Sequence, residues 1–427
     1  MNDVILVGGG LTGLATATFC ARAGLRVTVL ERAAALGGRA RTDWIGGHGF
    51  NQGGHALYID GPAMRVLREL GVEHPGKKPP TAGALAIARG ALHGLPSGLV
   101  SMLATDLFGF GAKIEAARAF ATIARTDPRG LRDVTWQAWV SKIAPRPEVR
   151  DALGAVARVT TYANAPERAS AGETIAQIKA GLGPGVLYLD GGWQTLVNGL
   201  EKIALAAGVT IVHGGHAAGI DREGGGFVVT ARDQRIATRS VVVATGPATA
   251  RKLLGARAPD LGGDLTTIHT ACLDVGLAAP PHPERLFALG TDRPTYFSVH
   301  SASAHLAEKG ATIHLMKYLH PDEAHHARDD ESELEGVLDL VQPGWRDVLV
   351  TRRFLPNLVA SNALVAAGQR RPEVDATGAP GAFIAGDWVG GTGMLLDAAL
   401  ASAKQAAERA IAHVTHVAPA AATMAAE

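Results

Sequence analysis

The chain has 427 residues, of which 47% are hydrophobic and 19% charged, with a formal net charge of +1. This length accommodates two or three domains with cores of their own, and the near-zero charge gives no electrostatic reason to expect a nucleic acid partner. No uncharged apolar stretch is long enough for a transmembrane helix, and we expect no signal peptide. The two cysteines, Cys20 and Cys272, form no C-x-x-C motif, which argues against zinc fingers and favours a reducing, cytoplasmic location.

The first thirty residues predict one βαβ unit. Residues 4–7 (VILV) are a continuous apolar run, typical of a buried parallel strand. Residues 14–23 follow a helical pattern that Gly24 ends, and residues 26–30 predict a second strand. The turn between the first strand and the helix reads GGGLTG at 8–13 and matches G-x-G-x-x-G. Its position between a strand and a helix favours a dinucleotide site over a simple turn.

Each glycine of this turn meets a separate physical need. Gly8 permits the tight turn, Gly10 lets a pyrophosphate approach the backbone, and Gly13 allows close packing of helix and strand. The helix start then offers free N–H groups and a positive dipole to phosphate. Glu31, 21 residues after Gly10, can accept hydrogen bonds from ribose hydroxyls and would repel a 2′-phosphate, so NADP is not expected.

The middle of the chain alternates in texture. Residues 90–179 read as mostly helical, residues 186–250 return to mixed α/β, and residues 265–360 contain short alternating strands. Helices are predicted at 99–108, 112–124, 136–143, 148–158, 196–207 and around 331–340. Strands are predicted at 209–212, 227–230, 236–238, 240–244, 268–275, 295–300 and 312–318, with 227–230 and 236–238 as a hairpin.

The end of the chain repeats the opening layout. Residues 381–391 read as a strand followed by a glycine-rich turn, and a helix begins near Met394. The alanine-rich tail predicts frayed structure. The nucleotide-binding domain is therefore expected in three pieces, 1–80, 181–250 and 376–415. A second domain is expected at 81–180 and 251–375, with a frayed tail at 416–427.

Residues 36–42 (LGGRART) follow the second strand and add a further glycine pair and an arginine. Together with GGGLTG, this block resembles the flavoprotein superfamily of amine oxidases, phytoene desaturases and protoporphyrinogen oxidases. Segments 49–58, 190–196, 243–247 and 386–396 are similar to further blocks of the same superfamily. The resemblance implies FAD as cofactor and an α/β fold, with a Rossmann-type FAD-binding domain built from discontinuous segments and an α+β substrate or cap domain.

The resemblance also implies positions along the cofactor. Arg39 would offer its guanidinium to phosphate, Gly53 and Gly54 would approach the flavin N5 edge, and His55 would lie near the reacting face. Gly386 and Asp387 would hold the ribityl and pyrophosphate part, while the last helix would point its N-terminus at the flavin N1 and C2 carbonyl edge. The expected cofactor-binding residues are Gly8, Gly10, Leu11, Thr12, Gly13, Glu31, Arg32, Gly38, Arg39, Gly53, Gly54, His55, Ala217, Gly386, Asp387, Leu395 and Leu396. No catalytic acid or base is assigned.

Two departures bear on the substrate. Leu395 falls where amine oxidases of this superfamily place an aromatic residue, and segment 268–272 lacks their lysine near N5. Lys317 on a later strand either substitutes for that lysine or lies on the surface. These departures favour the phytoene desaturase branch, with an apolar, isoprenoid-like substrate. An amine oxidase with an altered cage and a non-catalytic escort-type binder remain open.

Two other segments have a composition that bears on function. Segment 94–110 is apolar and predicts either a packed cap helix or an apolar entrance that touches a membrane surface. Segment 320–326 (HPDEAHH) is histidine-rich, but its charge and the absence of a recurring ligand spacing favour a solvated loop, so no metal site is expected. The oligomeric state is not predicted.

Overall fold

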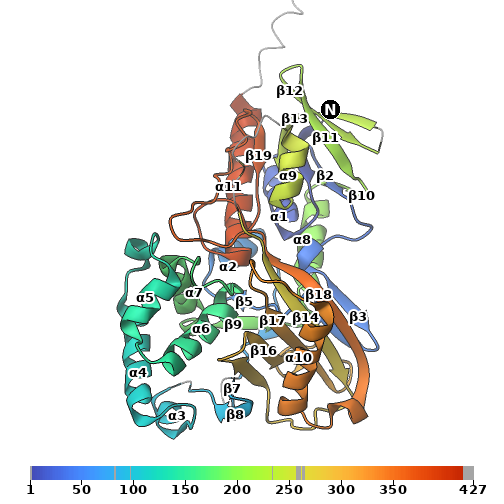
Figure 1. Ribbon diagram of the computed structural model, residues 1–427. Helices are drawn as coiled ribbons and strands as arrows, with labels where there is room; N and C mark the ends of the chain where they lie inside the picture. The colour runs from blue at the N-terminus through green and yellow to red at the C-terminus, as the bar shows by residue number, and fades with distance from the viewer. Residues whose placement is uncertain are drawn as a thin grey trace, which may run out of the picture.

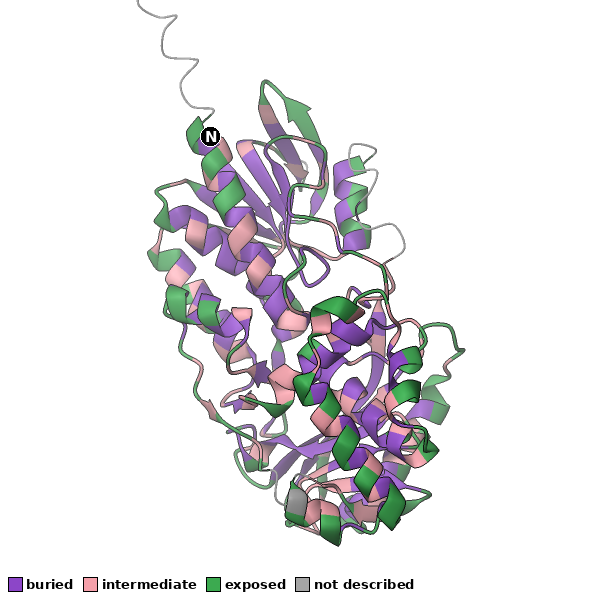
Figure 2. Cartoon of the chain, turned by 90° about the vertical axis from the view of Figure 1, so that its left-hand side faces the viewer, coloured by how far each residue is buried: buried purple, intermediate pink, exposed green. Residues whose placement is uncertain are grey.

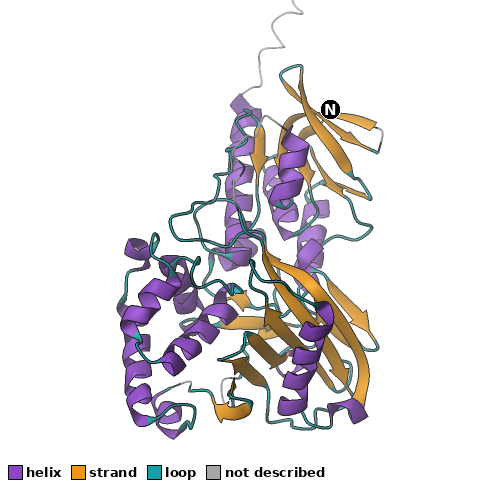
Figure 3. Cartoon of the chain, viewed as in Figure 1, coloured by secondary structure: helices purple, strands orange, loops and turns teal. Residues whose placement is uncertain are grey.

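A computed structural model describes residues 2–80, 83–96, 98–232, 234–255, 261 and 265–416. Figures 1 and 3 show a nucleotide-binding part at the top, which contains both the first strand and the last helix, and below it a second sheet beside a lobe of helices.

The first sheet has seven strands drawn from three distant segments of the chain. Its parallel part has the order β10-β2-β1-β13, and β19 pairs with β13 on the side away from β1. The antiparallel strands β12 and β11 extend it from β13. The bounds are β1 (Asn2–Val7), β2 (Val27–Glu31), β10 (Thr210–His213), β11 (Ala217–Glu223), β12 (Gly226–Ala231), β13 (Gln234–Val243) and β19 (Ala382–Ile384). From β1 the chain continues to β2 on one side of that strand, whereas β13 lies on its other side. The carboxyl ends of β1 and β13 therefore form a topological switch point, where α/β proteins bind ligands.

Helices cover this sheet because their small residues permit close packing. Helix α1 (Leu11–Arg22) packs against α8 (Gln194–Ala206) and against α11 (Leu395–His416), and α11 also packs against α2 (Pro62–Leu70). The buried side of α11 is largely alanine. Helix α9 (Pro247–Leu254) packs on β11.

The second sheet also has seven strands, in the order β18-β14-β17-β16-β15-β7-β8, and is antiparallel except where β15 meets β7. Its strands are β7 (Leu85–Ala88), β8 (Ala91–Gly94), β14 (Ile268–Leu277), β15 (Phe287–Gly290), β16 (Thr295–Val299), β17 (Ala311–Tyr318) and β18 (Leu349–Ser361). Helix α10 (Ala327–Val341) packs on this sheet, and the hairpin β3 (Thr42–Ile45)–β4 (His48–Asn51) contacts β17. Strands β5 (Leu57–Tyr58), β9 (Val186–Leu189) and β6 (Gly76–Lys77) form a small third sheet.

The helical lobe packs around a core of its own that includes Trp136, Leu153 and Ile175. Its helices are α3 (Leu99–Ala104), α4 (Phe110–Arg125), α5 (Trp136–Ile143), α6 (Pro147–Thr161) and α7 (Ala171–Leu182). Figure 2 shows the strands of the first sheet as largely buried, whereas these helices alternate between buried and exposed residues. None of the helices in the described ranges combines the length and the hydropathy needed to span a bilayer.

The structure confirms the expected fold class, with a discontinuous Rossmann-type domain and an α+β domain. It corrects local details. The predicted strands at 236–238 and 240–244 form one strand, β13, because both parts pair with β1, while β12 and β19 follow one another along its other edge. The helix predicted at 99–108 ends at Ala104. The sequence reasoning missed α2, α7, α9, β3 to β9, β11, β15 and β18. The predicted tail lies, apart from His416, outside the described residues, and the domain limits stay a prediction.

Candidate functional site

A cavity of about 620 Å³ opens at the switch point of the first sheet and continues to the second sheet. This volume lies within the range of about 300–1,000 Å³ typical of ligand pockets. Of the predicted cofactor-binding residues, all except Gly13 line it. Segments that are hundreds of residues apart thus meet at one site.

The first glycine-rich turn has the geometry that its sequence predicts. Gly8 has a φ of +112°, which few other residues adopt. A Cβ on Gly13 would lie 1.9 Å from the carbonyl oxygen of Gly8, so only glycine permits this packing of helix and strand. A Cβ on Gly10 would meet nothing closer than the Gly37 carbonyl oxygen at 3.8 Å. The space in front of Gly10 is therefore open to a ligand, at the start of α1.

Glu31 ends β2 at the cavity wall. Its Oε2 accepts a hydrogen bond from the Gly9 amide at 2.7 Å, and its Oε1 accepts one from the Ala33 amide at 2.7 Å. These bonds fix the carboxylate and leave each oxygen a further lone pair for a ribose hydroxyl. Arg32 and Ala217 lie on the same wall. Ala217 begins β11 beside a bulge in the pairing with β12.

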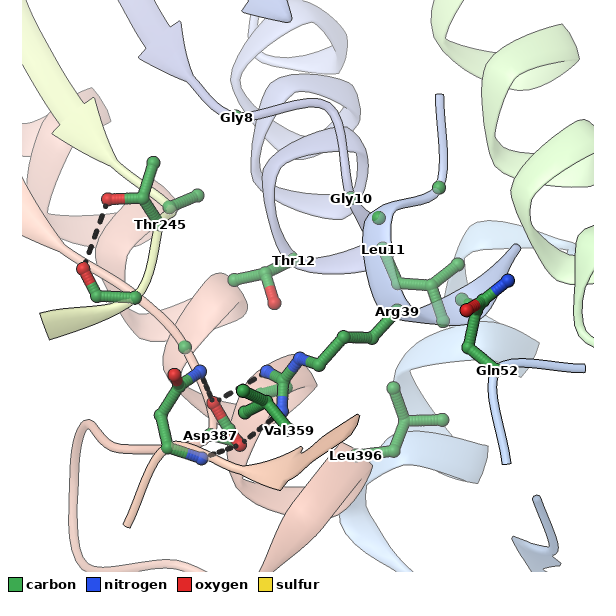
Figure 4. A pocket seen from close by; sticks show the side chains of 18 of the residues that line it. Gly8, Gly10, Leu11, Thr12, Arg39, Gln52, Thr245, Val359, Asp387 and Leu396 are labelled. Atoms are coloured by element: carbon green, nitrogen blue, oxygen red, sulfur yellow. Dashed lines mark hydrogen bonds and ion pairs between the residues drawn. The ribbon is translucent and has the colours of Figure 1, made fainter. Parts of the chain in front are cut away.

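Arg39 has a protein partner across the cavity. Its guanidinium binds Asp387 through two parallel hydrogen bonds of 2.8 Å each, as Figure 4 shows. Arg39 also lines the cavity, and its expected contact with the cofactor phosphate stays a prediction. The pair joins the first and last glycine-rich blocks, 348 residues apart.

Asp387 is the centre of a buried polar cluster. Its carboxylate also accepts hydrogen bonds from the Asn362 amide and side chain, both at 2.9 Å, and from Ser361 at 3.1 Å. Burial alone would raise the pKa of Asp387, but the Arg39 charge and these donors lower it to about 2. The carboxylate is thus fully engaged by protein groups, so Asp387 anchors the loop rather than presenting a free acceptor to the cofactor. Sequence reasoning missed Asn362, which carries no motif.

The strip Gly53–His55 lies where the cavity meets the second sheet. Gly53 has a φ of +91°, and a Cβ on it would lie 3.0 Å from Leu358. His55 stacks on Trp193 with ring centroids 4.3 Å apart. Burial lowers the pKa of His55 to about 3, so its imidazole is neutral. Its Nδ1 and the Trp193 Nε1 are buried without a hydrogen-bond partner in the described structure, although both residues line the cavity.

Tyr162 and Met316 complete this end of the cavity, and sequence reasoning missed both. Tyr162 caps α6 with a φ of +62°, a strained conformation for a bulky residue, and its hydroxyl donates to the Gly54 carbonyl. Met316 lines the cavity from β17, and the next residue, Lys317, forms ion pairs with Asp330 at 2.7 Å and Glu333 at 2.6 Å. Strand alternation turns Lys317 away from the cavity, so it does not substitute for the lysine of the amine oxidases. The periodicity of the strand alone could have shown this.

The last glycine-rich block ends at α11. Leu395 and Leu396 line the cavity, and Leu395 has a φ of +53°, unusual for a leucine. The turn after β13 also lines the cavity through Thr245 and Gly246.

One group in the described structure brings three potential metal ligands together, namely Glu167, His320 and Asp322. Asp322 is already bound to Arg168 at 3.0 Å, and the group lies outside the cavity. Both cysteines are buried, and burial raises the pKa of each thiol to about 12.

The residues present fit an FAD molecule. The open space before Gly10 at a helix start suits a pyrophosphate, and the fixed Glu31 carboxylate suits a ribose. At the other end of the cavity, the buried nitrogens of Trp193 and His55 that lack a protein partner suit a polar group of the ligand.

Comparison with known proteins agrees with this geometry. The family model described as flavin containing amine oxidoreductase matches residues 11–411. The coproporphyrinogen III oxidase of Mycobacterium bovis is 28% identical over 233 residues, which is 46% of this chain and 50% of that protein. The chain spans half or less of the length of the first curated relatives that it matches.

Solved structures share the fold over nearly the whole chain. An oxidoreductase from Methanosarcina mazei has a TM-score of 0.74 at 17% identity, with 95% of this chain and 100% of that chain covered. Putrescine oxidase bound to putrescine has a TM-score of 0.71 at 16% identity, with 96% and 99% covered. The chain therefore belongs to the flavin-containing amine oxidoreductase family.

Proposed function

We propose that the protein transfers a hydride between a C–H group of an apolar, isoprenoid-like substrate and flavin N5, in the manner of a desaturase. The observation that carries the proposal is the lack of a carboxylate at the substrate end of the cavity. Within the described residues, the acids that line the cavity are Glu31, Asp387 and Asp397, and all three belong to the nucleotide-binding part. The wall from the second sheet is formed by Thr270, Met316, Leu358, Val359 and Ala360.

This wall disfavours an amine. A substrate ammonium that leaves water needs a carboxylate or an aromatic cage to compensate its desolvation. Neutral His55 and the apolar side chains of Met316 and Leu358 offer no negative charge, and the aromatic rings that line the cavity are those of Tyr58, Tyr162 and Trp193. An apolar chain, by contrast, gains about 25 cal/mol for each Å² that it buries.

FAD supplies the two-electron chemistry when bound. The chain's own residues would hold and shield it. The start of α1 and Glu31 would bind the phosphate and ribose groups, the Arg39–Asp387 pair would fix the last loop, and Met316 and Leu358 would exclude water. No proton transfer to or from the substrate is assigned to a side chain.

A second candidate is the oxidation of a porphyrinogen, which the similarity to coproporphyrinogen III oxidase favours. Hydride removal from carbon would be common to both candidates. The two differ in the shape and charge of the substrate.

The test is anaerobic reduction of the FAD-loaded protein, followed at the flavin band, with a long-chain isoprenoid, coproporphyrinogen III and putrescine as separate substrates. We expect bleaching with the isoprenoid and a product lighter by two hydrogens. Leu358→Asp should raise KM for the isoprenoid at least about tenfold, because it puts a charge into the apolar wall. Asn357→Asp, at an exposed neighbour that does not line the cavity, is the matched control and should leave KM unchanged. Bleaching by putrescine alone would contradict the proposal, and bleaching by coproporphyrinogen III alone would favour the second candidate.

We also propose that the protein touches a membrane surface through the start of the helical lobe. Val100, Leu103 and Phe110 are 83%, 74% and 80% exposed, and the cationic Lys113 is bound to the Leu103 carbonyl. An apolar group beside a cation suits a lipid headgroup region. Sedimentation with vesicles that contain anionic lipid should fall when Leu103→Asp and Phe110→Asp are combined, and unchanged sedimentation would contradict this contact.

A further inference from the structure

Asp397 lies in the first turn of α11, and its carboxyl reaches the start of a second helix, α2. The residue is 5% exposed and lines the cavity. Its Oδ1 accepts a hydrogen bond from the Ala63 amide at 2.8 Å. This amide belongs to the first turn of α2, where helix N–H groups lack partners within the helix. Within the described residues, Oδ2 forms no hydrogen bond.

Two glycines make room for this carboxyl. A Cβ on Gly61 would lie 2.1 Å from Asp397 Oδ1, and a Cβ on Gly393 would lie 2.8 Å from the Asp397 Cβ. Gly61 has an ordinary φ of −70°, so its backbone does not require glycine. The site is therefore shaped around the acid, with one of its oxygens bound and the other left for the cavity.

The surroundings of Asp397 shift the pKa of its carboxyl towards neutral pH. Burial raises the pKa of its carboxyl to about 6, and the Ala63 amide and the Arg65 charge oppose this only in part. Tyr58 of β5 is neutral, because burial raises its pKa. The charged groups on the elements packed against α11 include Asp60 before α2, Arg65, Arg68 and Glu69 on α2, Arg22 on α1, and Arg235 and Arg239 on β13. On α11 itself they are Glu408, Arg409 and Lys404, the last of which pairs with Glu69, and Arg371 donates to the Gly393 carbonyl beside Asp397.

We propose that Asp397 is a positioning residue that sets the reduction potential of the bound flavin by taking up a proton when the flavin is reduced. The inference rests on the proposed function and on the expectation, implied by the family resemblance, that the flavin N1 and C2 edge lies at the start of α11. The positive end of the α11 dipole would stabilise the negative charge of the reduced flavin. Ionised Asp397 offsets this positive end and so lowers the reduction potential.

The exchange balances as follows. Two-electron reduction of FAD to its anionic form consumes two electrons and one proton. The new negative charge raises the proton affinity of Asp397. The carboxylate then takes one further proton from solvent and becomes a neutral acid, so that two protons accompany two electrons over the pH range in which Asp397 responds.

The experiment measures the flavin potential of the holoprotein between pH 5 and 8 by dithionite titration with reference dyes. For the wild type, we expect the ratio of reduced to oxidised flavin at fixed potential to change about a hundredfold per pH unit (about 59 mV) within a window, namely the pH range in which Asp397 takes up its proton on reduction. Above the window it should change about tenfold (about 29.6 mV). Asp397→Asn keeps an acceptor for the Ala63 amide but binds no proton, and should give the tenfold dependence throughout.

The control is Asp375→Asn, at an exposed acid outside the cavity, which should reproduce the wild-type profile. An Asp397→Asn profile identical to the wild type would overturn the proposal, because the second proton would then belong to another group. A wild-type profile without the steeper window would also overturn it.

If Asp397→Asn does not fold, the wild type alone decides. The infrared difference spectrum of reduced minus oxidised protein, with isotope-labelled aspartate, should contain a carboxylic-acid carbonyl band, and absence of that band would overturn the proposal. None of these measurements uses a substrate, so their outcomes do not depend on whether the desaturase assignment is correct.

Discussion

Gly10 and Gly13 lie three residues apart, yet the structure gives them different tasks. Gly13→Ala places a Cβ 1.9 Å from the Gly8 carbonyl oxygen, so we expect it to lower the free energy of unfolding by about 3 kcal/mol or more. Gly10→Ala places a Cβ in open space, 3.8 Å from its nearest protein neighbour. It should leave the stability of the apoprotein unchanged and lower FAD affinity at least about a hundredfold. Urea unfolding and FAD titration check the pair, and equal effects on stability would contradict the assignment.

The Arg39–Asp387 pair gives an asymmetric prediction, because Asp387 is 3% exposed and Arg39 is 40% exposed. Arg39→Met leaves a buried carboxylate with its strongest partner removed, which should lower the free energy of unfolding by about 3 kcal/mol. Asp387→Asn leaves a cation that reaches water, so its effect should be smaller. The opposite ranking in urea unfolding at pH 7 would contradict this account.

The same pair has a defined pH dependence. The pKa of Asp387 is about 2 in the folded protein, below its ordinary value of 3.8. Its stabilising contribution is therefore present above about pH 4 and is lost as the pH falls towards 2. Wild-type stability should fall more steeply over this range than that of Arg39→Met.

At the scale of elements, Arg353 fastens the β3–β4 hairpin to the second sheet. Its guanidinium binds Asp43 of the hairpin at 2.8 Å and the fully buried Asp274 of β14 at 2.6 Å. Asp274 also binds His314 of β17 at 2.6 Å. The hairpin leads directly into Gln52 and the glycine strip at the cavity, so this network positions the floor of the site.

Arg353→Met should lower the free energy of unfolding by about 3–5 kcal/mol, because it removes the cation that compensates a buried acid. It should also weaken FAD binding through displacement of the hairpin. Arg352→Met, on the same strand, removes more exposed pairs with Glu331 and Glu335, and should change stability by no more than about 1 kcal/mol. Chemical unfolding and FAD titration of both variants check the contrast, which similar losses would contradict.

At the scale of the whole molecule, FAD joins segments that the chain supplies separately. Binding to the folded state alone should stabilise it by about 2.7 kcal/mol when free FAD is at 100 times its Kd. For a chain of 427 residues this corresponds to a rise in Tm of about 3 °C. Calorimetry with and without FAD checks the rise.

Acid precipitation of the holoprotein should release the flavin into the supernatant. Flavin bands retained in the pellet would indicate a covalent link and would direct attention to His55. A protein that takes up no FAD at all would contradict the cofactor assignment and favour the escort-type binder.

The sequence by itself determined the features that depend on neighbours in the chain. The turn at 8–13, the acid Glu31 at the end of β2 and the second glycine-rich block at 386–391 follow from local backbone needs and from fixed spacings. They were enough to predict an α/β fold with a dinucleotide site, and the resemblance of these blocks to a flavoprotein superfamily implied FAD and the discontinuous domain. Strand alternation by itself also predicts that Lys317 points away from the face that Met316 occupies.

Only the tertiary structure decided which distant residues meet. Tyr162 reaches the Gly54 carbonyl across 108 residues, Arg39 binds Asp387 across 348 residues, and Asp397 meets the start of α2 across 334 residues. None of these contacts leaves a periodic or compositional signal, because each depends on how separate helices and sheets pack together. The burial that shifts the pKa values of His55 and Asp397 has the same origin, since desolvation is a property of the packed molecule and not of a sequence position.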